Sequence, residues 1–294
     1  MEQGAGVIGV LGGSGVYELD ALEDARWERV GSPFGAPSDA ILRGRFGGAE
    51  YAFLPRHGRG HRIPPSEIDY RANLDALKRI GVTDLISVSA CGSLREELAP
   101  GTFVLVDQFV DRTFARAKSF FGTGCVAHVS IADPVCARLG DALEAAGRAA
   151  GIRLHRGGVY LAMEGPQFSS RAESELYRSW GCDVIGMTNM PEAKLAREAE
   201  ICYASVAMVT DYDCWHPHEA DVQVSDIVAV LADNAARGRQ LVSGLAKELA
   251  RRPTPCPSGC DRALDTAIIT PPDARDPSLL ARLDAVAGRV LRGS

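Results

Sequence analysis

Short hydrophobic runs alternate with longer amphipathic segments along most of the chain. The runs at 7–11, 85–89 and 202–209 are continuous and rich in β-branched residues, and glycine or polar residues follow each of them. Such runs are typical of strands that are buried on both faces of a sheet. Similar runs predict further strands at 40–46, 51–54, 102–109, 159–163, 184–187 and 267–269.

The segments between these runs carry hydrophobic residues near helical spacing. In 67–80 this pattern lies between Ser66, a suitable N-cap, and Gly81, a suitable C-cap. Further helices are predicted at 134–151, 170–180, 192–200, 224–249 and 277–291. Alternation of strands and helices predicts an α/β fold in one domain, with a mixed, largely parallel central sheet flanked by helices on both faces.

A proline-rich stretch at 251–257 interrupts this alternation. We therefore expect one domain over residues 1–250 and a C-terminal extension, 251–294, that packs on the same domain. A chain of 294 residues is long enough for a single large α/β domain.

Charge and composition exclude several classes of protein. The formal net charge is −6, which disfavours a non-specific nucleic-acid binder, because such a protein needs a basic face. No hydrophobic run approaches the roughly 20 residues that a membrane helix needs, and Met1–Gly4 begins no secretory signal. Eight cysteines, mostly single in hydrophobic surroundings, are expected to be free thiols. These features predict a cytoplasmic protein without a nucleic-acid or membrane partner.

Small and polar residues follow several predicted strands, where ligands bind in open α/β sheets. Gly12, Gly13 and Ser14 can present backbone N–H groups and a hydroxyl to an anion, and Arg56 adds a cationic fork. Further donors at strand ends are Ser89, Ala90 and Thr188. The glycines alone are typical of an ordinary turn, but together the strand ends favour a phosphate site.

The glycine run does not match the better-known nucleotide and hydrolase motifs. No Gly-Lys-Ser/Thr follows it, the third glycine of the dinucleotide fingerprint is missing, and no Gly-x-Ser-x-Gly elbow surrounds Ser14. These departures disfavour a Walker A nucleotide-binding protein, a nicotinamide dehydrogenase and a serine hydrolase.

Asp211 and Asp213 follow the hydrophobic run 202–209. On an extended segment, their i, i+2 spacing turns both carboxyl groups to the same side. In a partly hydrophobic pocket such groups have raised pKa values and can hold a proton near neutral pH. The pair could therefore bind a heterocycle through a ring nitrogen and an exocyclic amine, although a turn or N-cap pair is the commoner role.

No metal site is predicted. Cys256 and Cys260, and His216 with His218, have spacings that match no strong zinc signature. We expect a disulfide or two free thiols at Cys256 and Cys260, and the redox state of this pair stays open.

The order of these motifs resembles a known family. The matching segments are GVLGGSG (9–15), SPFGAPS (32–38), RHGRGH (56–61), SACGSL (89–94), EGPQFSSRAE (164–173), GMT (186–188) and TDYDCW (210–215). They resemble the trimeric purine nucleoside phosphorylase family, and most closely its members that cleave 5′-methylthioadenosine. The resemblance covers roughly residues 7–250.

The resemblance implies a pentosyltransferase of purine and methionine salvage that forms adenine and 5-methylthioribose 1-phosphate, with inorganic phosphate as co-substrate and no cofactor. It also implies a homotrimer. Phosphate would contact Ser14, Arg56, His57, Ser89, Ala90 and Thr188. Phe168 would pack on the base and Met187 on the ribose, while Asp211 supports proton delivery to N7 and Asp213 accepts from the 6-amino group. Val224 and Ile227 would line the 5′ pocket, which His128 and, on a weaker match, Ile269 would close from a neighbouring subunit.

Alternatives remain open from the sequence. A phosphorylase of methylthioinosine, inosine or guanosine typically has asparagine at the position of Asp211, because a carboxylate repels a 6-oxo group. The motifs do not distinguish a preference for 5′-methylthioadenosine from one for 5′-deoxy- or 5′-halo-adenosine. From other classes, a dinucleotide-binding oxidoreductase and a non-catalytic nucleoside-binding protein are the competing interpretations.

Overall fold

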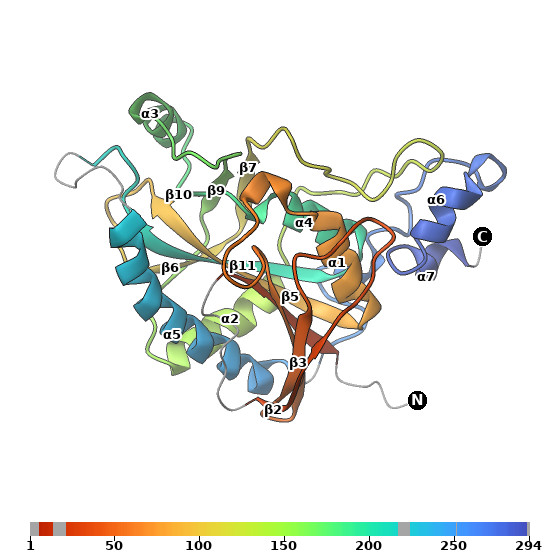
Figure 1. Cartoon of the computed structure of the whole chain (residues 1–294), viewed down its shortest axis with the longest axis horizontal. Coiled ribbons are helices and arrows are strands. Elements are labelled where there is room, and N and C mark those ends of the chain that lie inside the picture. The colour runs from red at the N-terminus through yellow and green to blue at the C-terminus, as the bar shows by residue number, and fades with distance from the viewer. Residues whose placement is uncertain (1–5, 14–21, 217–223, 251, 293–294) are drawn as a thin grey trace.

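The computed structural model describes residues 6–13, 22–216, 224–250 and 252–292, together with the backbone but not the side chains of 224–229 and 231. Ten β-strand pairings join its strands into one mixed sheet, in which parallel pairs predominate (Figure 1). The strands are β1 Val7–Gly12, β2 Glu23–Glu28, β3 Ile41–Phe46, β4 Ala49–Pro55, β5 Val82–Ser93, β6 Phe103–Val106, β7 Gln108–Asp111, β8 Leu154–Arg156, β9 Val159–Ala162, β10 Val184–Gly186 and β11 Cys202–Asp211. This architecture confirms the predicted fold class.

The long strand β5 is the branch point of the sheet. Its first part pairs in parallel with β1 on one side and β11 on the other, and its end pairs antiparallel with β10 at Gly92 and Ser93. One branch continues from β10 through β9 to β7, and the other from β11 through β6 to β8. As a result, the ends of β5, β10 and β11 meet in one region.

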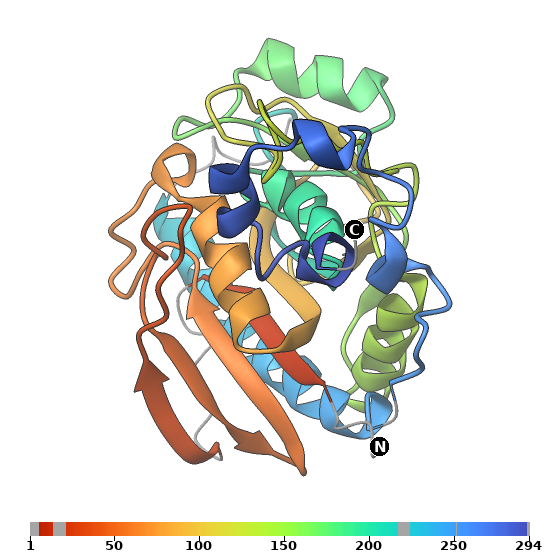
Figure 2. The same ribbon diagram turned by 90° about the vertical axis from the view of Figure 1, so that its right-hand side faces the viewer.

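Helices cover both faces of the sheet (Figures 1 and 2). On one face, α1 (Tyr70–Arg79) and α4 (Asn189–Glu198) bury residues such as Leu74 and Leu195 in a hydrophobic cluster with β1 and β4. On the other face, α2 (Ala137–Ala149) and α5 (Val224–Glu248) pack Leu143 and Leu241 against β5, β6 and β11. Helix α3 (Arg171–Ser179), which begins with a capping box at Ser170, covers a third and smaller cluster.

The C-terminal segment packs on the same body. It contains the 3₁₀ turns η2 (Cys260–Arg262) and η3 (Pro272–Ala274) and the short helices α6 (Pro277–Arg282) and α7 (Gly288–Leu291). Leu264, Leu283 and Val286 are buried in the cluster that contains α1 and α4, and Figure 2 shows this segment lying across that face. A domain boundary near residue 250 stays a prediction.

Several predicted elements differ from those observed. The helix predicted at 67–80 begins later, because Pro64 and Pro65 favour the 3₁₀ turn η1 (Pro65–Glu67). Its N-cap is Asp69, which accepts from the Ala72 N–H, so the assignment to Ser66 was wrong. The helix ends at Arg79, and Gly81 follows with φ +90°.

Three other differences reflect tertiary contacts. The strand predicted at 102–109 is two strands, β6 and β7, which belong to different branches of the sheet. The strand predicted at 267–269 is a single bridge between Ala127 and Ile268, and the helix predicted at 277–291 is divided into α6 and α7. Strand β2 was missed because its residues are charged and mostly exposed at the edge of the sheet.

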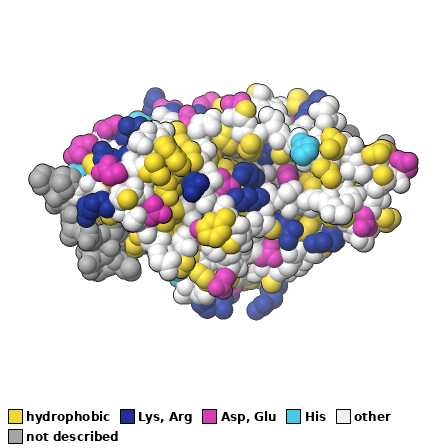
Figure 3. All heavy atoms as spheres, turned by 90° about the horizontal axis from the view of Figure 1, so that it is seen from above, with side chains coloured by type: hydrophobic (Ala, Val, Ile, Leu, Met, Phe, Trp, Pro, Cys, Tyr) yellow, Lys and Arg dark blue, Asp and Glu magenta, His cyan; other side chains and the backbone are white. Residues whose placement is uncertain are grey.

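The surface carries charges of both signs. On the face seen in Figure 3, basic and acidic side chains are interspersed, and no single sign dominates. Within the described parts of the chain, no helix combines the length and hydrophobicity needed to cross a membrane.

Candidate active site

The predicted site residues gather where strands of the sheet end. Arg56 and His57 follow β4, and Ser89 and Ala90 lie near the end of β5. Thr188 follows β10. Because β5 pairs with β1, β10 and β11, these strand ends are close neighbours in space.

Arg56 is fully buried and is held by a carboxylate of α4. Its Nε lies 2.5 Å from Glu192 Oε1, and Glu192 is itself completely buried. Nη2 donates to Leu11 O (2.9 Å) and Ser87 Oγ (2.6 Å), and Nη1 donates to Val88 O (3.0 Å). Most of the guanidinium N–H groups are therefore used inside the protein. Arg56 fixes the ends of β1 and β5 in place, and no pattern in the sequence indicated its partner Glu192.

Asn189 connects the hydroxyl groups of β5 to α4. Ser89 Oγ donates to Asn189 Oδ1 at 3.3 Å, and the Asn189 amide donates to Ser205 Oγ on β11. Thr188, the N-cap of α4, is 6% exposed, yet its Oγ1 has no hydrogen-bond partner among the described residues. A buried hydroxyl without a partner is costly. It is explained if a ligand oxygen occupies the adjacent space.

His57 is buried and neutral at physiological pH. Desolvation, together with the charge of Arg56, lowers the pKa of His57 to about 4. Nδ1 lies 2.8 Å from Ile63 O, so this nitrogen carries the proton and Nε2 is left as an acceptor. Its ring stacks on His61 with centroids 4.2 Å apart. In this state His57 can accept a hydrogen bond from a protonated phosphate oxygen but adds no positive charge.

Asp211 and Asp213 form the second half of the site. Desolvation raises the pKa of both carboxyl groups. Asp211 accepts from Thr210 Oγ1 at 2.7 Å, and the Ser169 hydroxyl lies 2.8 and 3.0 Å from the two carboxyl oxygens of Asp213. These hydrogen bonds fix the orientation of two carboxyl groups that retain protons more readily than exposed ones.

The local geometry of the pair is not the predicted extended one. Strand β11 ends at Asp211, and Asp213 has φ +54°. The Asp213 N–H donates to Asp211 Oδ1 at 2.8 Å. This hydrogen bond closes a turn, so the chain after Asp211 no longer belongs to the sheet. The expectation of an extended segment was therefore wrong. A turn, and not the pleat of a strand, brings the two carboxyl groups together.

Gly92 of β5 makes room for this turn and was missed by the sequence reasoning. A Cβ atom at this position would lie 3.0 Å from Asp211 Oδ1 and 3.3 Å from Asp213 Cβ. The absence of a side chain therefore allows both aspartates to lie against the end of β5. Its place in the motif at 89–94 was the available signal.

Two candidate substrate contacts lie on neighbouring loops. Phe168 is 48% exposed, on the loop that precedes α3. Met187, half-buried, packs its sulfur against Gly165, where a Cβ would lie only 2.6 Å away. Gly165 has φ +72°, so the close approach and the backbone conformation both require glycine there.

Arg116 and Glu164 hold these loops together, a role that the sequence did not reveal. The buried Arg116 donates to the carbonyls of Met187 (2.5 Å), Met190 (2.7 Å) and Glu164 (2.8 Å). The Glu164 carboxylate accepts from Ser66, from the N–H groups of Phe114 and Ala115, and from Arg116 Nε at 3.1 Å. Burial alone would raise the pKa of Glu164, but these hydrogen bonds and the charge of Arg116 lower it to about 2.

Replacing Glu164 by Gln is therefore expected to destabilise the protein near neutral pH by about 3 kcal/mol. Because the folded-state pKa lies below the unfolded value of 4.5, the stabilisation is complete above about pH 4.5 and is lost as the pH falls towards 2. Urea unfolding of wild type and variant at pH 7 and pH 3 measures this difference. A gap that stays constant between the two pH values would contradict the assignment, and exposed Glu97→Gln is the control.

His128 lies apart from this arrangement. Its backbone N–H donates to Ala267 O (2.9 Å), and the backbone N–H of Ile269 donates to Val126 O (3.0 Å). The structure therefore brings together His128 and Ile269, the two residues expected to reach a neighbouring subunit. Figure 1 shows the preceding loop extending towards α6. His128 lines a surface pocket of about 400 Å³ with Phe121 and Val129. Ile269 is 61% exposed.

Three predicted site residues cannot be placed. Ser14 lies outside the described residues, and the side chains of Val224 and Ile227, at the start of α5, are also outside them. The part of the predicted phosphate site formed by the glycine turn is therefore described only as far as Gly13, and the 5′ pocket is not described on the α5 side.

Comparisons with known proteins agree with this geometry. The model of the phosphorylase superfamily matches residues 7–247. The chain is 67% identical to S-methyl-5′-thioadenosine phosphorylase of Cereibacter sphaeroides over 287 residues, which are 98% of this chain and 99% of the relative, and 54% identical to that of Geobacter sulfurreducens over 98% and 99%.

Solved structures of lower sequence identity share the fold. A methylthioadenosine phosphorylase from an antarctic soil metagenomic library superposes with a TM-score of 0.91 at 46% identity, covering 96% of this chain and 99% of that one. A methylthioadenosine phosphorylase from Schistosoma mansoni in complex with adenine superposes at 0.83 with 34% identity, over 92% and 99%. The chain therefore belongs to the phosphorylase superfamily, in the family of S-methyl-5′-thioadenosine phosphorylases.

Proposed function

We propose that this protein cleaves 5′-methylthioadenosine by phosphorolysis. A phosphate oxygen attacks C1′ as the C1′–N9 bond breaks and a proton reaches N7, which gives adenine and 5-methylthioribose 1-phosphate. The observation that carries this proposal is the pair Asp211 and Asp213, whose carboxyl groups are desolvated and held against the end of β5. The hydroxyl groups expected to bind phosphate lie no more than the length of one strand away.

In the part of the site where phosphate is expected to bind, neutral hydrogen-bond donors lie beside the buried cation Arg56. Ser89, Thr188 and backbone N–H groups at Ala90 and the glycine turn are the expected ligands, and the open Thr188 hydroxyl supports this role. Arg56 is paired with Glu192, so it acts mainly through the position of the strand ends. A bound phosphate dianion stabilises the positive charge that develops at C1′ in the transition state.

The base side stabilises the leaving group. Asp211, with its raised pKa, supports protonation of N7, and Asp213 accepts from the 6-amino group. Protonation makes adenine a better leaving group. The carboxylate acceptor disfavours a 6-oxopurine, whose oxygen would face it lone pair to lone pair. Phe168 packs on the base and Met187 on the ribose.

The spacing of the two sides fits a nucleoside. Ser89 and Gly92 lie three positions apart on β5, a distance of about 10 Å in an extended strand. The ribose of the substrate fits between phosphate at the first position and the purine at the second.

No cofactor or metal is needed for this reaction. All eight cysteines are free in the structure, which supports a reducing compartment such as the cytoplasm. A homotrimer remains our proposal for the assembly. His128 and Ile269, together on one exposed surface, would close the 5′ pocket of a neighbouring subunit.

Incubating the pure protein with 5′-methylthioadenosine should release adenine only when inorganic phosphate is present, as measured by chromatography. Adenine and 5-methylthioribose 1-phosphate should form in equal amounts. Equal release in water alone would identify a hydrolase, and binding without release would identify a non-catalytic nucleoside-binding protein. Running 5′-deoxy- and 5′-halo-adenosine and inosine in parallel determines the 5′ and base preferences.

A further inference from the structure

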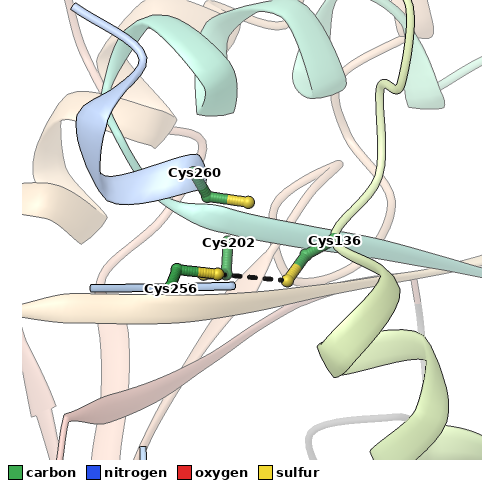
Figure 4. A group of neighbouring side chains, drawn as sticks. All are labelled: Cys136, Cys202, Cys256 and Cys260. Carbon is green, nitrogen blue, oxygen red and sulfur yellow. Dashed lines mark hydrogen bonds between the residues drawn. The ribbon is translucent and has the colours of Figure 1, made fainter. Parts of the chain in front are cut away.

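Four cysteines from three distant parts of the chain meet in the protein interior. Cys136 lies at the start of α2, Cys202 begins β11, and Cys256 and Cys260 belong to the C-terminal segment. All four side chains are buried, and their Sγ atoms all lie within 4.8 Å of one another. Figure 4 shows the four side chains converging from these segments. The catalytic proposal uses none of them.

Two of the six sulfur separations match the edges of a tetrahedral metal centre, and none exceeds 4.8 Å. Cys202 and Cys256 have their Sγ atoms 3.5 Å apart, and Cys136 and Cys256 have theirs 3.8 Å apart. Four thiolates around one ion with Zn–S bonds of about 2.3 Å have S···S edges of about 3.8 Å. A disulfide would instead need about 2.05 Å between two sulfurs. The compact arrangement also suits a single ion better than an iron–sulfur cluster, which places several atoms between the cysteines.

The backbone of the C-terminal segment forms a turn that brings Cys256 and Cys260 together. Cys256 and Cys260 have the C-x₃-C spacing found among zinc ligands. Gly259 between them has φ +68°, and its N–H donates to Cys256 O at 2.8 Å. The carboxylate of Asp261 accepts from the Cys256 N–H at 2.9 Å. This tight turn directs both sulfurs to the same point, which the spacing alone did not establish.

Cations surround the sulfur atoms. Arg252 Nη2 lies 3.6 Å from Cys202 Sγ, and Arg197 Nη1 lies 4.0 Å from Cys260 Sγ. Arg138, paired with Asp84, interacts with Cys202 as well. Four thiolates and one divalent ion carry a net charge of −2, which is costly to bury without compensation. Arg138 and Arg252 share Asp84 as a counter-charge, so the three guanidinium groups compensate part of this charge.

We propose that Cys136, Cys202, Cys256 and Cys260 bind one zinc ion as a structural site. Four protein ligands leave no open coordination position for a substrate, which is the mark of a structural site. Cys202 begins β11 whereas Asp211 ends it, so the two sites are about 30 Å apart along an extended strand. The ion fastens the C-terminal segment to β11 and α2.

The first experiment measures metal in the intact protein. Purified protein, produced with zinc in the medium, should contain about one zinc ion per chain by inductively coupled plasma mass spectrometry. Titration with a mercurial reagent should release it as the thiols react. Zinc below about a tenth of an ion per chain, another metal in its place, or an intact mass lower by four hydrogens, which indicates two disulfides, would each overturn the proposal.

The second experiment uses a matched pair of variants. Cys260→Ala should lose the zinc and have a lower Tm, and Cys182→Ala, which removes another buried thiol, should retain it. Zinc retained in Cys260→Ala would refute the site. Should Cys260→Ala not fold, protein grown with cobalt provides the answer: four thiolates give intense thiolate-to-cobalt charge-transfer absorption and tetrahedral d–d bands, and the absence of these bands would refute it.

Discussion

Replacing Asp211 by Asn should lower kcat/KM for 5′-methylthioadenosine by about 10²–10⁴-fold. The side chain keeps its size, and its oxygen can still accept from the Asp213 N–H. The amide would donate to Thr210 Oγ1, whose own proton can go to Cys91 O, but the side chain can no longer supply a proton towards N7. Cleavage of 6-oxopurine nucleosides should fall much less, because N7 and the 6-oxo oxygen lie on the same edge of the base and are both acceptors, to which an amide at position 211 can donate where a carboxylate repels them. Steady-state kinetics on methylthioadenosine and inosine measure both effects.

The control for this variant is Asp141→Asn, an exposed position on α2 whose carboxylate pairs with Arg156. Its kinetics should match those of the wild type on both substrates. Equal losses on methylthioadenosine and inosine in Asp211→Asn would show that this carboxyl group does not recognise or protonate the base.

Replacing Glu192 by Gln should destabilise the protein by about 3–5 kcal/mol, because it leaves the buried Arg56 without its counter-charge. Arg56 is 1% exposed and Glu192 is fully buried, so water cannot compensate. Glu192 also accepts from Ser87 (2.7 Å) and Tyr203 (3.2 Å), and these hydrogen bonds would weaken too. Urea unfolding followed by tryptophan fluorescence measures the loss.

Glu175→Gln is the matched control for this change. Glu175 pairs with Arg178 on the surface of α3, and its side chain is 54% exposed, so its loss should change stability by no more than about 0.5 kcal/mol. A loss below about 1 kcal/mol in Glu192→Gln would show that the interior tolerates an uncompensated Arg56. In that case the pair would not fix the phosphate side.

The candidate site was predicted best where its chemistry is local in the sequence. Asp211 and Asp213 lie two residues apart at the end of a strong hydrophobic run, so the strand and the carboxyl groups that follow it could be predicted together. Arg56 was identified as a site residue, but its interpretation as a cationic fork for phosphate missed its partner Glu192, 136 residues away. No hydrophobic or polar periodicity along the chain indicates the pairing of Arg56 with Glu192.

The sequence by itself determined the α/β class, most strands, the helices of the main body and the residues at the strand ends, because these depend on hydrophobic patterns over five to fifteen residues. Only the tertiary structure decided the branching of the sheet at β5, the turn that joins the two aspartates and the meeting of four cysteines from positions 136, 202, 256 and 260. Those features depend on which strands pair and how distant segments pack. Such long-range contacts are selected by the burial of the whole chain, not by any local run of residues.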